Sequence, residues 1–329
     1  MTCLRRVLPF CIAALLAMAG APVRAEGTAT GAVLVMNSNE ATLSVIDLAR
    51  RVELRRLPVL REPHHWALTP DGQDLLVGDT VANELIVLDP ARFTIRRRVP
   101  VADPYQLGFS PDGKLLVVNA LARAQVDVYE AGSYRLVKRF PLKSMPSHLA
   151  FSPDSGVVYV SLQGTDRLAA IDLRRMEPLW NAPVGRTPAG VMWLNGRVLV
   201  ANMGSDDVSV VDPATGAVER RIRTGKGAHQ LFLSPDGRLL YVNNRLDANG
   251  VSVLDAATLA PLRSYRLPGG PDDIAFAPDG HLWFTLRFAN KVAVLDPASG
   301  QYETIAVGRS PHGIFLNPAA MVATSVAAR

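Results

Sequence analysis

Cysteine is almost absent from this sequence of 329 residues. The two that occur, Cys3 and Cys11, both lie within the first 25 residues. Those residues resemble a removable secretion signal, so the processed chain would contain no cysteine at all. Disulfide bonds, thiolate metal sites and a cysteine nucleophile are therefore excluded from the mature protein.

The first 25 residues have the three parts of a signal peptide. Arg5 and Arg6 give a basic start, residues 7–19 form an apolar run, and small residues precede a predicted cleavage after Ala25. We therefore expect a signal peptide over 1–25 and a protein that is periplasmic or secreted. An uncleaved segment that anchors the domain at the inner membrane is the alternative.

Long apolar runs and an excess of one charge are missing as well. Residues 7–19 are fewer than the roughly 20 that a spanning helix takes, and no later run approaches that length, so no integral membrane segment is expected. Three of the 35 basic residues fall in the signal, and against 30 acidic residues the mature chain has a net charge of about +2. Such a balance gives no electrostatic argument for a nucleic-acid partner. We expect a monomer.

Amphipathic helical patterns are absent after residue 25. A β-rich unit recurs instead about every 42 residues, which is typical of propeller blades. In each unit an apolar strand leads into a tight turn, where proline fixes one backbone angle and glycine supplies a positive one. The Pro-Asp-Gly form of this turn occurs at residues 70–72, 111–113, 235–237 and 278–280.

A second β-rich run follows each turn and ends in a small polar residue. A third run alternates apolar and polar residues and closes on aspartate, as in residues 208–212, and a fourth strand follows another turn. Four short strands per unit indicate an all-β fold, a seven-bladed β-propeller with four-stranded antiparallel blades. The polar ends of the second runs are Asn37, Asp79, Asn119, Ser161, Asn202, Asn243 and Thr285.

The two ends of the chain complement each other. The first unit lacks a strand before Gly31, while residues 311–317 supply an extra first-strand sequence. We therefore expect the C-terminal strand to complete the first blade, because a closed ring has no open edge that could template aggregation. The expected propeller spans residues 26–318, followed by a C-terminal tail over 319–329.

Residues 31–318 resemble the YVTN, or YncE-like, propeller family. The name-giving strand of that family is similar to Tyr241-Val242-Asn243-Asn244, and two of the third strands end in Val-Ile-Asp or Val-Val-Asp. The resemblance implies the propeller fold. It implies no particular activity, because most members of the family lack a defined one.

Polar residues near the start of the first strands mark a candidate site. Antiparallel connections place these starts on one face of the ring, around the mouth of the central channel, where propellers usually bind ligands. Only His281 among the histidines lies at a turn on the opposite face. The main candidates, on four consecutive blades once the last strand joins the first blade, are His229, Asp272, His312 and His64. The secondary candidates on the same face are His65, Tyr105, His148, Arg245 and Arg287.

Three imidazoles and a carboxylate suit a divalent metal ion, because these are the ligands left to a protein without thiolate. They would also serve as an axial ligand to a non-covalent tetrapyrrole, or as a general base. The alternative is that these side chains only line a water-filled funnel. Arg245 and Arg287, which follow strand ends closely, would hold the carboxylate or phosphate of a small anionic ligand.

Two further resemblances bear on function. The haem-binding propeller of dissimilatory nitrite reductase is similar in its repeats and in the histidines at its channel mouth. It has eight blades, however, and the present sequence has no Cys-x-x-Cys-His for covalent haem. Residues 280–285, with Asn290 and residues 311–313, resemble a repeat of streptogramin B lyase, a metal-dependent seven-bladed enzyme.

We therefore expect an exported binding, cofactor-pathway or protein-interaction factor that acts through its histidine-rich face, rather than an enzyme. Its expected partner is a periplasmic protein or a small anionic ligand. The alternatives are a metal-dependent lyase or hydrolase of the streptogramin B lyase type, and a pure protein-binding scaffold. A scaffold would tolerate the loss of His229 and His312, whereas the cofactor-related role and the lyase or hydrolase role would both need these residues.

Overall fold

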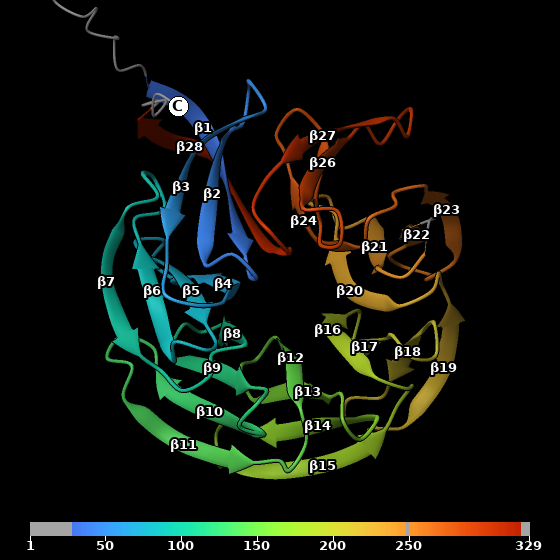
Figure 1. Ribbon diagram of the computed structural model, residues 1–329. Helices are drawn as coiled ribbons and strands as arrows, with labels where there is room; N and C mark the ends of the chain where they lie inside the picture. The colour runs from blue at the N-terminus through green and yellow to red at the C-terminus, as the bar shows by residue number, and fades with distance from the viewer. Residues whose placement is uncertain (1–27, 248–249, 324–329) are drawn as a thin grey trace, which may run out of the picture.

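Seven four-stranded sheets form a ring in the structure of the chain, a computed structural model (Figure 1). The structure describes residues 28–247 and 250–323, so the expected signal peptide over 1–25 lies outside the described residues. The ring of seven sheets confirms the predicted β-propeller. Among the residues described, no helix has the length and apolar character needed to cross a membrane.

The blades are numbered here along the chain, and within each blade the strands follow one another from the centre of the ring outward. Blade one contains β28 (Pro311–Ala323), β1 (Thr28–Asn37), β2 (Thr42–Asp47) and β3 (Val52–Pro58). Blade two contains β4 (Pro63–Leu68), β5 (Leu75–Asp79), β6 (Glu84–Leu88) and β7 (Ile95–Pro100). Blade three contains β8 (Gln106–Phe109), β9 (Leu115–Ala120), β10 (Gln125–Glu130) and β11 (Leu136–Pro141). Blade four contains β12 (Pro146–Phe151), β13 (Val157–Leu162), β14 (Arg167–Asp172) and β15 (Glu177–Pro183). Blade five contains β16 (Pro188–Leu194), β17 (Arg197–Asn202), β18 (Asp207–Val211) and β19 (Val218–Arg223). Blade six contains β20 (Ala228–Leu233), β21 (Leu239–Asn244), β22 (Val251–Asp255) and β23 (Pro261–Tyr265). Blade seven contains β24 (Pro271–Phe276), β25 (Leu282–Leu286), β26 (Lys291–Leu295) and β27 (Tyr302–Ala306).

The C-terminal strand closes the ring, as predicted. Strand β28 pairs antiparallel with β1, from Asn37 opposite Pro311 to Thr28 opposite Ala323. The strand therefore runs on through residues 319–323, which we expected in a C-terminal tail. It does so because Ala320 and Val322 are buried against blades one and two, where they join the apolar core.

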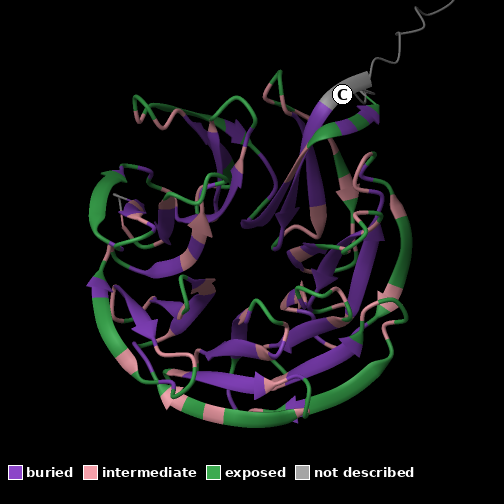
Figure 2. Ribbon diagram, turned by 180° about the vertical axis from the view of Figure 1, so that it is seen from behind, coloured by how far each residue is buried: buried purple, intermediate pink, exposed green. Residues whose placement is uncertain are grey.

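Apolar side chains fill the space between neighbouring blades. The middle strands of a blade, such as β5 and β6, are buried throughout because each has another blade on either side. The outermost strands, such as β11 and β15, expose most of their residues to solvent (Figure 2). Only the innermost strands reach the centre of the ring. The face on which those strands begin is called the upper face below.

Candidate functional site

Innermost strands from four consecutive blades begin at the upper face with the main candidate residues. The structure brings these side chains together at the centre of the ring and adds two of the secondary histidines to them. Five histidines of this group each expose at most 4 % of their surface. We call the set the central cluster; it consists of His64 in β4, His65 in β4, His148 in β12, His229 in β20, Asp272 in β24 and His312 in β28.

A β-bulge at the start of the innermost strand determines which side chains reach the cluster. In blade two the register between β4 and β5 shifts between Pro63 and Trp66, and blades one, four, five, six and seven have a similar irregularity. A bulge places two residues opposite one, so adjacent side chains need not alternate between the faces of a sheet. His64 and His65 therefore both enter the central cluster, although simple alternation would separate them.

Polar residues at the ends of the second strands hold the backbone of the cluster in place. Thr285, in β25, donates its hydroxyl to the carbonyl of His312 (2.7 Å) and accepts the backbone N–H of Asp273 (2.9 Å). Asn243, in β21, donates a side-chain N–H to the carbonyl of Asp272 (3.0 Å). Buried backbone groups need such partners, because an unpaired one costs stability. The repeated small polar residues thus connect neighbouring blades at the site.

Asp272 is the charged residue of the central cluster. Its Oδ1 accepts a hydrogen bond from Nη2 of Arg245 and lies 2.9 Å from Nδ1 of His229. Its Oδ2 lies 3.1 Å from Nη1 of Arg287 and 3.2 Å from Nδ1 of His312. Burial acts to raise the pKa of this carboxyl, but His312, Arg245 and His229 outweigh burial and hold the pKa well below its usual range. Asp272 is therefore ionised, with one imidazole and one guanidinium at each oxygen.

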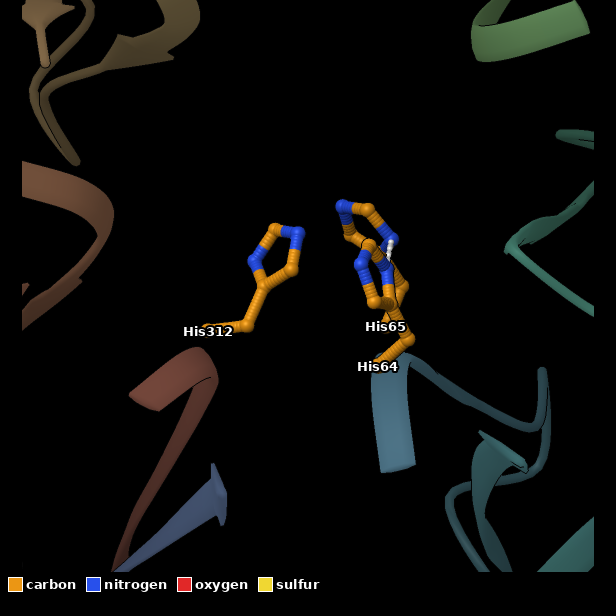
Figure 3. Close-up of side chains that lie close together, drawn as sticks. All are labelled: His64, His65 and His312. Carbon is orange, nitrogen blue, oxygen red and sulfur yellow. Dashed lines mark hydrogen bonds between the residues drawn. The ribbon is translucent and has the colours of Figure 1, made fainter. Parts of the chain in front are cut away.

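His64, His65 and His312 offer one nitrogen each within 4.8 Å of one another. Their side chains point toward one another from β4 and β28 (Figure 3). The rings of His64 and His312 lie 3.8 Å apart between centroids, and Nδ1 of His64 is 2.8 Å from Nδ1 of His65. Nδ1 of His65 is also 2.8 Å from the carbonyl oxygen of Tyr105. Since a carbonyl only accepts, this Nδ1 carries the proton, and Nε2 of His65 keeps its lone pair.

The imidazoles of the central cluster are neutral and incompletely hydrogen-bonded. Burial lowers the pKa of all five histidines, and for His65 the pKa falls to about 4. Buried polar atoms are nearly always paired, so unpaired ones at a single place require an explanation. A neutral imidazole with a free nitrogen is the form that binds a metal ion. Among the described residues, a buried Nε2 without a hydrogen-bond partner occurs in His65, His148, His229 and His312.

Tyr105 lies beside the central cluster, whereas His281 lies on the opposite face of the ring. The ring of Tyr105 lies 4.2 Å from that of His64 between centroids, and burial raises the pKa of its phenol, so the hydroxyl stays protonated near pH 7. His281 lies on the face opposite the cluster, where its Nδ1 is 3.1 Å from Oδ2 of Asp279. One histidine of the six is thus separate from the site and offers a natural control for it.

A family profile described as a YNCE-like beta-propeller matches residues 2–321. The chain belongs to the YncE-like β-propeller family. No curated protein matches the sequence of this YncE-like propeller. The family assignment agrees with the resemblance carried by the repeats.

Several solved structures share the fold of this YncE-like propeller. A functionally unknown protein from Desulfotomaculum acetoxidans has 14 % identity and a TM-score of 0.75, with 87 % of this chain and 99 % of that chain covered. Dihydro-heme d1 dehydrogenase NirN, in complex with DHE, has 16 % identity and a TM-score of 0.66, with 91 % of this chain and 78 % of that chain covered. The periplasmic gluconolactonase PpgL of Pseudomonas aeruginosa has 21 % identity and a TM-score of 0.70, with 88 % of this chain and 99 % of that chain covered. At these identities the likeness concerns the fold.

Sequence reasoning missed one ionisable residue of the YncE-like propeller. Asp273 is buried beside Asp272, and its Oδ1 has no hydrogen-bond partner among the described residues. Burial and the neighbouring charge of Asp272 raise the pKa of Asp273 well above its usual range, which favours the protonated carboxyl. The signal was available in the repeats, because Asp273 is the second residue after Pro271, just as His65 is the second residue after Pro63.

Proposed function

We propose that this YncE-like propeller binds a divalent transition-metal ion at the centre of its ring, through one imidazole nitrogen each from His64, His65 and His312. The observation that carries the proposal is the set of partners behind these rings. A metal-binding histidine usually donates its second ring N–H to a carboxylate or a backbone carbonyl, which orients the ring. The carbonyl of Tyr105 stands in this position for His65, and the ionised carboxylate of Asp272 lies 3.2 Å from Nδ1 of His312.

The chemistry of the ligands limits the identity of the ion. Imidazole suits zinc, copper, nickel, cobalt and iron, whereas magnesium and calcium prefer oxygen. Three ligands also leave the fourth position of a tetrahedral site open. With bonds of about 2.1 Å, two ligands of a tetrahedral ion are about 3.4 Å apart. The three nitrogens start within 4.8 Å of one another, so small rotations of the imidazole rings bring them to an ion.

A non-covalent tetrapyrrole is the second candidate, because one structural neighbour, NirN, is a dihydro-heme d1 dehydrogenase. An axial imidazole needs space for the whole macrocycle on one side of its nitrogen. The histidines of the central cluster are at most 4 % exposed, and Arg245 and Arg287 stand beside them at the upper face. This degree of burial favours a single ion over a macrocycle.

We also propose that the protein works as a binding factor outside the cytoplasm, after cleavage behind Ala25. The signal-like pattern of residues 1–25 supports this location, and the structural neighbour PpgL is a periplasmic protein. Fractionation of expressing cells, followed by N-terminal sequencing, tests the proposal. A mature chain that begins at Glu26 is expected in the soluble periplasmic fraction, and a full-length chain in the membrane fraction would contradict it.

Metal content and the visible spectrum of the untagged protein, purified from periplasm, test the metal site. Wild type is expected to carry about one ion per chain, or to take up one from zinc, cobalt, nickel or copper salts. His65→Ala and His312→Ala should lose it, while His281→Ala, on the opposite face, should keep it. A tetrapyrrole absorption band would favour the second candidate. A wild type that takes up none of these ions and stays colourless would overturn the proposal. A protein-binding scaffold would then be the remaining function.

A further inference from the structure

We infer that the ion-loaded site takes a small anionic ligand, a carboxylate or another oxyanion, held beside the ion by Arg245 and Arg287. This inference rests on the proposed metal site and names the class of molecule that completes it. Its support comes from the hydrogen-bonding capacity of the two arginines, from their position, and from the balance of charge at the centre of the ring.

Arg245 and Arg287 share a single carboxylate. Each guanidinium has five N–H donors, yet among the described residues both have Asp272 as their one ion-pair partner. Within the described part of the chain, Nε of Arg245 is buried without a hydrogen-bond partner, and its Nη1 has only the weak acceptor Sδ of Met203 at 4.0 Å. The two groups therefore keep donors for an oxyanion, whose geometry a guanidinium matches with two parallel hydrogen bonds.

The two guanidiniums lie on the solvent side of the central cluster. Their side chains are 15 % and 20 % exposed, whereas the side chain of Asp272 is fully buried. Nη1 of Arg287 and Nδ1 of His312 both contact Oδ2 of Asp272, so Arg287 stands next to a proposed ligand of the ion. Arg287 also acts electrostatically on His64 and His65, so an anion that its free donors hold lies near the three proposed ligands of the ion.

The charges at the centre of the ring do not balance once the ion is bound. The two guanidiniums carry one positive charge more than the Asp272 carboxylate with which they pair, and imidazole ligands bind as neutral groups. A divalent ion adds two positive charges in a region that solvent barely reaches. Buried charges are costly unless they are neutralised. An anion that enters with the ion removes this cost, so the two ligands should each strengthen the binding of the other.

The upper face carries basic residues at a repeated position. In five of the seven blades an exposed lysine or arginine lies in the loop just before the innermost strand. Charge of one sign around a recessed site raises the local concentration of ligands of the opposite sign. The same loops also contain the acidic residues Glu62 and Asp103, but the basic residues outnumber them and favour the approach of an anion to the central cluster. The basic residues are Arg61, Lys143, Arg186, Lys226 and Arg309.

Cobalt-loaded protein provides the test, because the visible absorption of Co²⁺ reports what occupies its coordination positions. Acetate and phosphate are titrated in turn into the mature protein, with perchlorate used to keep the ionic strength constant. A saturable spectral change is expected in the wild type. Arg245→Gln and Arg287→Gln should bind Co²⁺ and weaken the anion response at least tenfold. Lys138→Gln, on the exposed outer strand β11, should behave as the wild type.

The outcomes separate this inference from the proposal on which it rests. Co²⁺ binding without a response to either anion, or with the same response in the arginine variants, would overturn the anion site and leave the metal site intact. Absence of Co²⁺ binding in the wild type would overturn both. If the glutamine variants lose Co²⁺ as well, Arg245→Lys and Arg287→Lys are tested for anion binding instead. Lysine keeps the positive charge but lacks the planar guanidinium that forms two parallel hydrogen bonds. Weakened anion binding supports the inference, and unchanged anion binding contradicts it.

Discussion

Oδ2 of Asp272 lies 3.2 Å from Nδ1 of His312, and both side chains are fully buried. Nδ1 of His312 has no hydrogen-bond partner among the described residues, but the negative charge of Asp272 favours a proton on this facing nitrogen and a lone pair on Nε2. The same carboxylate binds Arg245 and Arg287. One residue therefore orients a proposed metal ligand and also positions the two groups proposed to hold an anion.

Asp272→Asn should weaken metal binding by about 10–100-fold, the usual effect of changing the partner behind a metal ligand. The amide also leaves two arginines without a counter-charge, so stability should fall by about 3–5 kcal/mol. Chelator competition measures the first effect and urea unfolding the second. Asp279→Asn, on the opposite face, is the matched control. Equal metal affinity in wild type and Asp272→Asn would show that this carboxylate does not orient a ligand.

Gly313→Ala tests how closely blades one and two must approach at the site. A Cβ at Gly313 would lie 2.6 Å from the carbonyl oxygen of His64, and backbone must move to relieve this contact. Displacement of His64 should reduce metal affinity at least tenfold and lower the melting temperature. Gly132→Ala is the control, because a Cβ at Gly132 meets nothing within 4 Å. If both alanine variants bind metal equally well, the position of His64 does not matter for the ion.

Thr285→Val removes the hydroxyl that bonds the carbonyl of His312 and the N–H of Asp273. Both backbone groups then lie buried without this partner, so the free energy of unfolding should drop by about 1–3 kcal/mol. Thr304→Val, on the exposed outer strand β27, should change it by less than about 0.5 kcal/mol. Urea unfolding curves compare the two variants. Similar losses in both would contradict a special role for the hydroxyl of Thr285.

Chains shortened at the C-terminus test the closure of the ring. A chain that ends at Pro318 loses the buried Ala320 and Val322, and its melting temperature should fall well below that of a chain ending at Ala323. The chain that ends at Ala323 should match the full-length protein. Removal of everything from Pro311 onward deletes β28 and should prevent stable folding. Equal melting temperatures for the chains ending at Pro318 and Ala323 would contradict the extended closing strand.

The number of blades and the closure of the ring could be predicted from the sequence because their signals are local and repeated. Pro-Asp-Gly turns mark the lower end of four innermost strands, and alternating apolar residues mark the strands between turns. The end of the closing strand was harder to predict. Ala320 and Val322 are small apolar residues in a weak pattern, and their burial depends on contacts with another blade.

The membership of the central cluster could be predicted in part. The repeat alignment identified His229, Asp272, His312 and His64 on four consecutive blades, since each is the second residue of an innermost strand. It placed His65 and His148, one residue further along, among the secondary candidates and omitted Asp273. The bulge at the start of these strands cancels the usual alternation of side chains, and a bulge depends on pairing with the second strand rather than on residue type.

Anomalous X-ray diffraction from crystals of the zinc- or cobalt-loaded protein, recorded at the absorption edge of the metal, tests the central claim most directly. The account predicts one strong anomalous peak at the centre of the ring, about 2.0–2.1 Å from one imidazole nitrogen each of His64, His65 and His312. A peak at another place, or the absence of a peak in metal-soaked crystals whose three imidazoles stay apart, would contradict it.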